Sequence, residues 1–130
     1  MEDSAVMEPN EHLAHYINAL RDVTHIANQH WWENLETGEP LQRNVGEMIA
    51  LMHSELSEML EAHRKDLMDD KLIHRKGLEV EASDLLIRLL DFCGGLKLDL
   101  GGSYIEKMKY NGQRADHKRE ARLSAHGKKY

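Results

Sequence analysis

Two pairs of acidic residues have a spacing that suits metal-ion chemistry. Glu55 and Glu58 are three residues apart in the segment HSELSEML, and Glu81 and Asp84 are three apart in the segment VEASDLL. Side chains at this spacing lie on the same face of an α-helix. On a helical wheel Glu55 falls among methionines and leucines, where an ionised carboxylate is unstable unless it is protonated, paired or bound to a cation.

Four carboxylates converge if these two segments face each other. Like charges that close repel strongly, which either raises their pKa values or requires cations between them. Sites built only from oxygen ligands favour hard ions, so we expect Mg²⁺, with Mn²⁺ as a substitute. Because protein-bound Mg²⁺ often shares its shell with substrate phosphates, the pattern indicates phosphate chemistry. The open alternative is that each acidic pair lies on a solvated helix face.

A face of complementary charge is predicted towards the C-terminal end. Tyr104, Lys107, Asn111, Arg114 and Lys118 fall within a single arc of a helix. Their donors suit phosphate oxygens, so a polyphosphate between metal-bound carboxylates and this face would satisfy both. A solvated basic helix face is the alternative.

The elements that carry these residues are predicted to be helices. Strand signals are nearly absent, because β-branched residues are scattered and no alternating run of useful length occurs. Both prolines, Pro9 and Pro40, lie outside the periodic segments. We expect Asn10 and Ser103 to cap the first and the last helix. The helices are predicted over residues 10–30, 44–65, 78–96 and 103–117.

This arrangement predicts an all-α fold, a four-helix-type bundle. At 130 residues the chain should form a single domain over 1–130, with flexible termini at 1–9 and 119–130. A bundle of this size has only a modest core, so we expect oligomerisation to complete it.

Composition and charge narrow the class of protein. The formal net charge of −6 argues against general binding to nucleic acid. The single cysteine, Cys93, excludes a disulfide within the chain and lies in an apolar run typical of a core residue. No apolar run reaches the roughly 18 residues that a membrane span requires. The sequence therefore predicts a cytoplasmic protein without a membrane partner.

Several other catalytic motifs are missing. The nine histidines form neither HExxH nor Glu-x-x-His, which argues against zinc-protease and di-iron sites. There is also no phosphate-binding loop of the GxxxxGK[ST] type, no GxGxxG and no GxSxG. The two tryptophans, Trp31 and Trp32, end the first predicted helix. Packing is one role for them, and stacking on a nucleobase, with Trp32 as the candidate, is another.

The order of these motifs resembles that of the MazG-like, all-α nucleoside triphosphate pyrophosphohydrolases. ELSE at 55–58 and EASD at 81–84 resemble the family's ExxE…ExxD signature, and KMKYNGQR at 107–114 resembles its Lys/Asn/Arg segment. The resemblance extends from about residue 45 to 114. The family's first motif is often written EExxE, and here Ser54 stands in place of the leading glutamate.

The resemblance implies an activity and a set of roles. Family members hydrolyse (d)NTPs to monophosphate and pyrophosphate with Mg²⁺, and they assemble as dimers or tetramers. This chain would then act as a homodimer or homotetramer, with water attacking the α-phosphorus and pyrophosphate leaving. The implied metal ligands are Glu55, Glu58, Glu81 and Asp84, of which Glu55 and Glu58 are also candidates for activating water. The implied substrate contacts are Lys107, Asn111 and Arg114, with Tyr110 as a further candidate.

Two other classes of function remain as alternatives. A non-catalytic helical interaction module would not require the acidic stripes to converge. A nucleic-acid-binding helical protein would use the basic side chains at the C-terminal end and would show strongly salt-dependent binding. Those basic side chains are Arg114, Lys118, Arg119, Arg122, Lys128 and Lys129.

Overall fold

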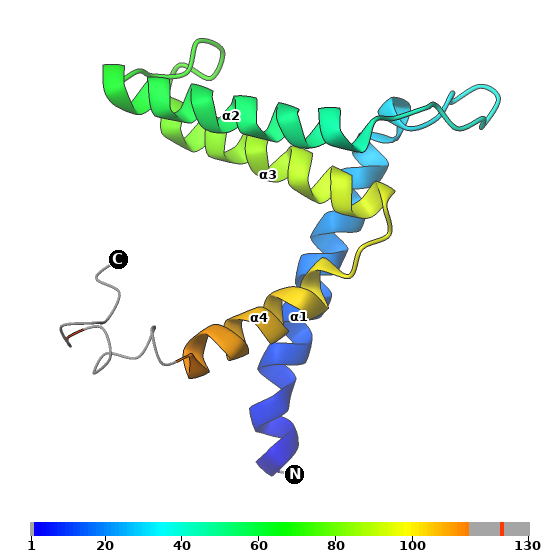
Figure 1. The fold of residues 1–130 in the computed structure, drawn as a ribbon, viewed down its shortest axis with the longest axis vertical. Coiled ribbons are helices and arrows are strands. Elements are labelled where there is room, and N and C mark those ends of the chain that lie inside the picture. The colour runs from blue at the N-terminus through cyan, green and yellow to red at the C-terminus, as the bar shows by residue number, and fades with distance from the viewer. Residues whose placement is uncertain (1, 115–122, 124–130) are drawn as a thin grey trace. The chain divides into compact units, whose positions relative to one another are not determined.

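The computed structural model describes residues 2–114 and residue 123, with side chains from residue 10 onward, and its described elements are helices (Figure 1). They are α1 (Glu2–Ala27), the short 3-10 helix η1 (Gln29–Trp31), α2 (Val45–Lys65), α3 (Gly77–Gly95) and α4 (Leu100–Gln113). No strand occurs in these ranges, and the prediction of an all-α protein is confirmed. None of the helices in the described part of the chain has the length and apolarity to cross a bilayer.

The chain divides into two compact units, which we describe separately. One comprises residues 1–19 and 99–130, and the other comprises residues 20–98. Helix α1 contributes to both units. The second unit also contains η1, α2 and α3, and the first also contains α4.

In the second unit α2 and α3 lie side by side (Figure 1). Helix α2 begins where the Asn44 side chain accepts a hydrogen bond from the Glu47 backbone N–H at 3.0 Å, a standard N-cap. Its C-cap is Asp66, which has a left-handed backbone with φ of 49°. The last turn carries His63, Arg64 and Lys65, whose positive charge suits the negative end of the helix dipole.

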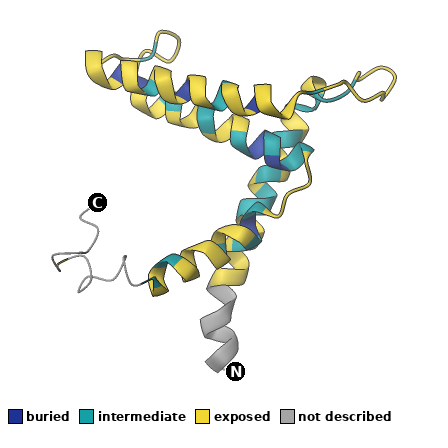
Figure 2. Ribbon diagram, viewed as in Figure 1, coloured by how far each residue is buried: buried dark blue, intermediate teal, exposed yellow. Residues whose placement is uncertain are grey.

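The apolar core of this unit is small. Figure 2 shows buried positions on both α2 and α3. The buried apolar residues are Met48 and Ala62 on α2 and Leu90 and Cys93 on α3. The prediction that Cys93 is a core residue is confirmed. Many large apolar side chains on the same two helices remain exposed, among them Ile49, Leu56, Leu60, Leu86 and Ile87. Exposed apolar surface of this extent is typical of interaction sites.

The end of α3 allows two bulky side chains to approach closely. A Cβ atom at Gly94 would overlap the His25 side chain, and one at Gly95 would overlap the indole of Trp32. Glycine at both positions therefore lets the end of α1 and the segment after it pack directly on the α3 backbone.

In the first unit a small hydrogen-bond network fixes the start of α4. Asp99 Oδ1 accepts from the Gly102 backbone N–H at 2.9 Å and from Asn18 Nδ2 at 2.9 Å. The Gly101 backbone N–H in turn donates to Asn18 Oδ1 at 2.8 Å. Asp99 thus caps α4, and Asn18 ties that cap to α1.

The predicted limits of the last helix were wrong at its start. Asp99 rather than Ser103 is the N-cap, so α4 begins at Leu100 and the two glycines lie in its first turn. The capping acceptor comes from the aspartate before the glycines and not from the serine after them. The helix ends at Gln113, and the predicted end at His117 lies outside the described residues.

The first helix also differs from the prediction. It begins at Glu2 instead of Asn10 and includes Pro9. A proline removes one backbone N–H and so frees one carbonyl, which interrupts the helical hydrogen bonds once without ending the helix here. At the other end α1 stops at Ala27, and the tryptophan segment continues as the 3-10 turn.

Gly101→Ala is expected to destabilise the protein by roughly 2 kcal/mol, because overpacking at a tight contact costs about 1–3 kcal/mol. A Cβ atom at this position would overlap the carbonyl oxygen of Ala14, which is backbone and cannot rotate away. Gly112→Ala is the matched control, since a Cβ there meets nothing within 4 Å. It should stabilise the helix by about 0.5–1 kcal/mol. Urea unfolding followed by circular dichroism measures both, and equal midpoints would contradict the close contact.

Candidate metal centre

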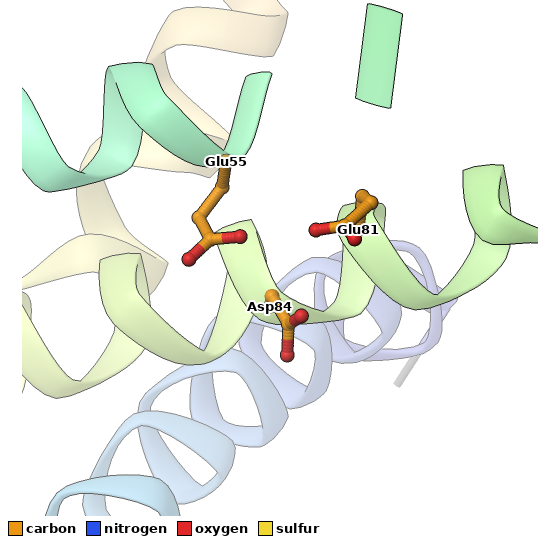
Figure 3. A group of neighbouring side chains, drawn as sticks. All are labelled: Glu55, Glu81 and Asp84. Carbon is orange, nitrogen blue, oxygen red and sulfur yellow. The ribbon is translucent and has the colours of Figure 1, made fainter. Parts of the chain in front are cut away.

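The packing of α2 on α3 brings three carboxylates together. Glu55 reaches from α2 towards α3, which carries Glu81 and Asp84 (Figure 3). One oxygen atom from each lies within 4.8 Å of the others. Glu58, the fourth predicted ligand, is exposed and is not part of this group, although it lines the same small cavity as Glu81.

Glu55 is the most buried member of the group, with 7% of its surface exposed. Its Oε1 accepts a hydrogen bond from Arg88 Nε at 2.8 Å. Its Oε2 is buried and has no hydrogen-bond partner among the described residues, and the same holds for Glu81 Oε2. Buried polar atoms are nearly always satisfied, so these two orphaned carboxylate oxygens indicate a missing proton or cation.

The pKa values of Glu55 and Glu81 are shifted in opposite directions. Burial by itself raises the pKa of Glu55, but the hydrogen bond from Arg88, the neighbouring Glu81 and Glu58 carboxyl groups and the charge of Arg88 outweigh it, so the pKa lies below its ordinary value. Burial, the neighbouring carboxyl groups of Glu58 and Glu55, and the negative charges of Glu58 and Asp84 raise the pKa of Glu81 to about 7. Of the three carboxyl groups, Glu81 is therefore the one that binds a proton most readily near neutral pH.

The pKa of Asp84 is also raised, by burial and by neighbouring negative charges. Burial raises its pKa, and the negative charges of Glu55 and Asp69 raise it further, while Arg88 opposes them. One arginine does not neutralise three carboxylates. A divalent cation would replace the shared proton and remove the repulsion.

The donor set fits a hard cation. All available ligand atoms are carboxylate oxygens, which suits Mg²⁺ or Mn²⁺ better than softer metals. The oxygens also lie close to the spacing that one ion imposes, since Mg–O distances of about 2.0–2.1 Å place its ligands roughly 3–4 Å apart. Glu55, Glu81 and Asp84 could therefore hold one such ion with small side-chain rotations.

A cavity of about 900 Å³ opens beside the carboxylates. One wall comes from α2 and α3, and the other comes from the segment that joins α1 to α2. The volume is within the range of about 300–1,000 Å³ that is common for small-molecule sites. Its lining residues are Asn28, Trp31, Leu41, Gln42, Arg43, Leu51, Glu55, Asp84, Ile87, Arg88 and Asp91.

Asp91 anchors the second wall of this cavity. It is 9% exposed, and its Oδ1 accepts from Trp32 Nε1 at 2.8 Å and from His25 Nδ1 at 2.9 Å. An ionised carboxylate only accepts, so the His25 proton sits on Nδ1. Trp32 is thus held by Asp91 and by its packing against Gly95, whereas Trp31 is the tryptophan that lines the cavity. Stacking of Trp32 on a base stays a prediction.

The predicted substrate contacts on α4 belong to the first unit, so their meeting with the carboxylates stays a prediction. Lys107 Nζ lies 4.8 Å from the Tyr110 ring centroid, and the Arg114 guanidinium lies 5.8 Å from it. Asn111 Oδ1 is buried without a hydrogen-bond partner among the described residues. Lys118 lies outside them.

Arg88 and Asp91 continue the acidic stripe of α3 at helical spacing, so the sequence places them on the same face as Glu81 and Asp84, but it assigns them no role in the site. Arg43, which also lines the cavity, was missed. Arg43 directly precedes the N-cap of α2 and carries no signal in its sequence context. Its position depends on the fold of the loop before α2.

Comparisons of the chain with protein-family models, with curated proteins and with solved structures find no match. The geometry of the carboxylate group and the sequence motifs are therefore the features that indicate a function.

Proposed function

We propose that this protein is an Mg²⁺-dependent nucleoside triphosphate pyrophosphohydrolase of the MazG-like kind, which cleaves (d)NTPs to (d)NMP and pyrophosphate. The observation that carries the proposal is the pair of buried, unpartnered oxygens on Glu55 and Glu81, of which Glu55 lines a cavity of about 900 Å³ together with Asp84. Carboxylates of this kind need a cation, and a cation beside a ligand-sized cavity suits a phosphate-bearing substrate.

The chain's own residues take distinct roles in this proposal. Glu55, Glu81 and Asp84 hold the ion, and Arg88 fixes the orientation of the Glu55 carboxylate. When bound, Mg²⁺ neutralises charge on the phosphoryl oxygens. Glu58, which is exposed and outside the group of three, is the carboxylate left to take a proton from the attacking water. The new bond joins water oxygen to the α-phosphorus, and the bond from that phosphorus to the bridging oxygen breaks.

A second copy of the chain completes the fold in this proposal, as a homodimer or homotetramer of four-helix-type bundles. The exposed apolar side chains of α1, α2 and α3 support it, because a stable soluble fold rarely leaves so many uncovered. In the assembled site Lys107, Asn111 and Arg114, with Tyr110, bind the phosphates or the sugar.

Product analysis on a panel of canonical and modified NTPs and dNTPs tests the reaction class. We expect monophosphate and pyrophosphate in equal amounts with Mg²⁺, reduced or retained turnover with Mn²⁺, and none after chelation. Release of orthophosphate instead would place cleavage at the wrong bond. If the folded protein turns over no member of the panel, the exposed apolar faces favour a non-catalytic helical interaction module.

A further inference from the structure

The positively charged side chain of Arg43 lines the cavity beside the carboxylates, and two contacts hold it in place. The guanidinium of Arg43 lies 5.1 Å from the ring centroid of Trp32, and its Nη1 donates to the Trp31 carbonyl oxygen at 2.8 Å. Arg43 is half-buried and lines the cavity together with Glu55 and Asp84. A flexible side chain is thus restrained at the edge of the candidate metal centre.

The restraint extends into the protein through Trp32. The indole that Arg43 covers is fixed by its N–H bond to the buried Asp91, at 2.8 Å. The same carboxylate oxygen accepts from His25 Nδ1 at 2.9 Å, and Gly95 gives the indole room to pack on α3. The entropy cost of ordering this long, flexible side chain is therefore met before any ligand binds. Such preorganisation is typical of binding residues.

The charge of Arg43 has no carboxylate partner in the part of the chain that the structure describes. Among the described residues it forms no ion pair with a carboxylate, whereas Arg88, in the same cavity, is paired with Glu55 at 2.8 Å. The known contacts of Arg43 involve one of its five N–H donors and one face of its plane. The remaining donors are available to a ligand, and a guanidinium suits the paired oxygens of a phosphate group.

We propose that Arg43 is a phosphate-binding residue of this cavity, which holds the phosphate chain of a nucleoside triphosphate in the unit that also carries Glu55 and Asp84. Trp32 and Asp91 are positioning residues, because they act through Arg43. The inference rests on the proposed function for the identity of the ligand as a nucleotide, but the phosphate site itself can be tested without turnover.

The test is a titration of the full chain with inorganic tripolyphosphate in the presence of Mg²⁺, followed by intrinsic tryptophan fluorescence. The only two tryptophans, Trp31 and Trp32, both contact Arg43, so they report on this cavity. The variants are Arg43→Gln and Arg43→Lys, and the matched control is Arg75→Gln. Arg75 is exposed, and its ion pair with Glu79 lies outside the cavity.

We expect Arg43→Gln to weaken tripolyphosphate binding about 10-fold or more, because hydrogen bonds to charged groups contribute roughly 1.5–3 kcal/mol. Arg43→Lys keeps the charge but loses the planar pair of donors, so its loss should be smaller but measurable. Arg43→Lys also serves as the test variant if Arg43→Gln does not fold. Arg75→Gln should bind as the wild type does. Equal affinity of the wild type and the Arg43 variants, or no binding by the wild type, would overturn the inference.

Steady-state kinetics separate this inference from the proposed function. An Arg43→Gln enzyme with raised KM or lowered kcat for its best NTP supports both. Unchanged KM and kcat would leave the pyrophosphohydrolase standing and remove Arg43 from the site. Tripolyphosphate binding that depends on Arg43, in a protein that hydrolyses no NTP, would overturn the proposed function and leave the phosphate site.

Discussion

Glu55→Gln is expected to lower kcat/KM for nucleoside triphosphates by about 100-fold or more, because a lost metal ligand removes several kcal/mol of charge stabilisation and each 1.4 kcal/mol is about tenfold. Glutamine has the same shape but carries no charge. It can still accept the hydrogen bond that Arg88 Nε now donates to Glu55 Oε1. The substitution therefore removes the affinity for a cation while keeping the local packing.

Stability should change little in the same variant. The Glu55–Arg88 ion pair is partly exposed at the arginine, and pairs of this kind contribute about 0–1 kcal/mol. Its loss is offset because Glu55 no longer repels Glu81 and Asp84. Thermal unfolding without metal measures this, and Glu47→Gln, which is exposed in the first turn of the same helix, is the control for activity. Wild-type turnover by Glu55→Gln would remove Glu55 from the metal site.

Mg²⁺ is expected to raise the melting temperature by several degrees above pH 7 and by little well below it, because Glu81 has a pKa of about 7. In the metal-free protein this raised pKa, against an ordinary value of 4.5, means that the folded state holds a proton that the unfolded state has released. The resulting stability is fully present below pH 4.5 and is lost as the pH rises through about 7. A cation that binds the ionised Glu81 carboxylate restores the lost stability of the folded state.

Thermal unfolding across this pH range, with Mg²⁺ and with a chelator, measures the effect. Glu81→Gln is the informative variant, because it removes both the titrating proton and one ligand. Its metal-free stability should vary less with pH, and Mg²⁺ should raise its melting temperature less. An equal increase on both sides of pH 7, or the same increase in Glu81→Gln, would contradict the assignment of Glu81.

The helices and the burial of Glu55 could be read from the sequence because both follow from periodicity. An apolar arc at a spacing of 3.6 residues must face a neighbouring element, and a carboxylate inside that arc must be buried with it. The same reasoning correctly brought Glu81 and Asp84 towards Glu55. It did not distinguish Glu58 from these three residues, although Glu58 lies at the edge of the arc and is exposed.

The features that were missed depend on contacts between segments far apart in the sequence. The side chain of Asp99 is held against α1 by Asn18, which is 81 residues away in the sequence. Arg43 lies in the cavity because Trp32 is fixed by Asp91, which belongs to a helix that begins much later in the chain. Neither contact has a local pattern, so periodicity could not show it.

The burial of Cys93 has a practical consequence for work on this protein. The residue is 4% exposed, and burial raises the pKa of its thiol, so very little reactive thiolate is present at neutral pH. As the only cysteine in the chain, it leaves the native protein almost inert towards maleimide reagents. A cysteine introduced at an exposed position such as Ser57 would then take up a spectroscopic label at a single site, with no need for a cysteine-free background.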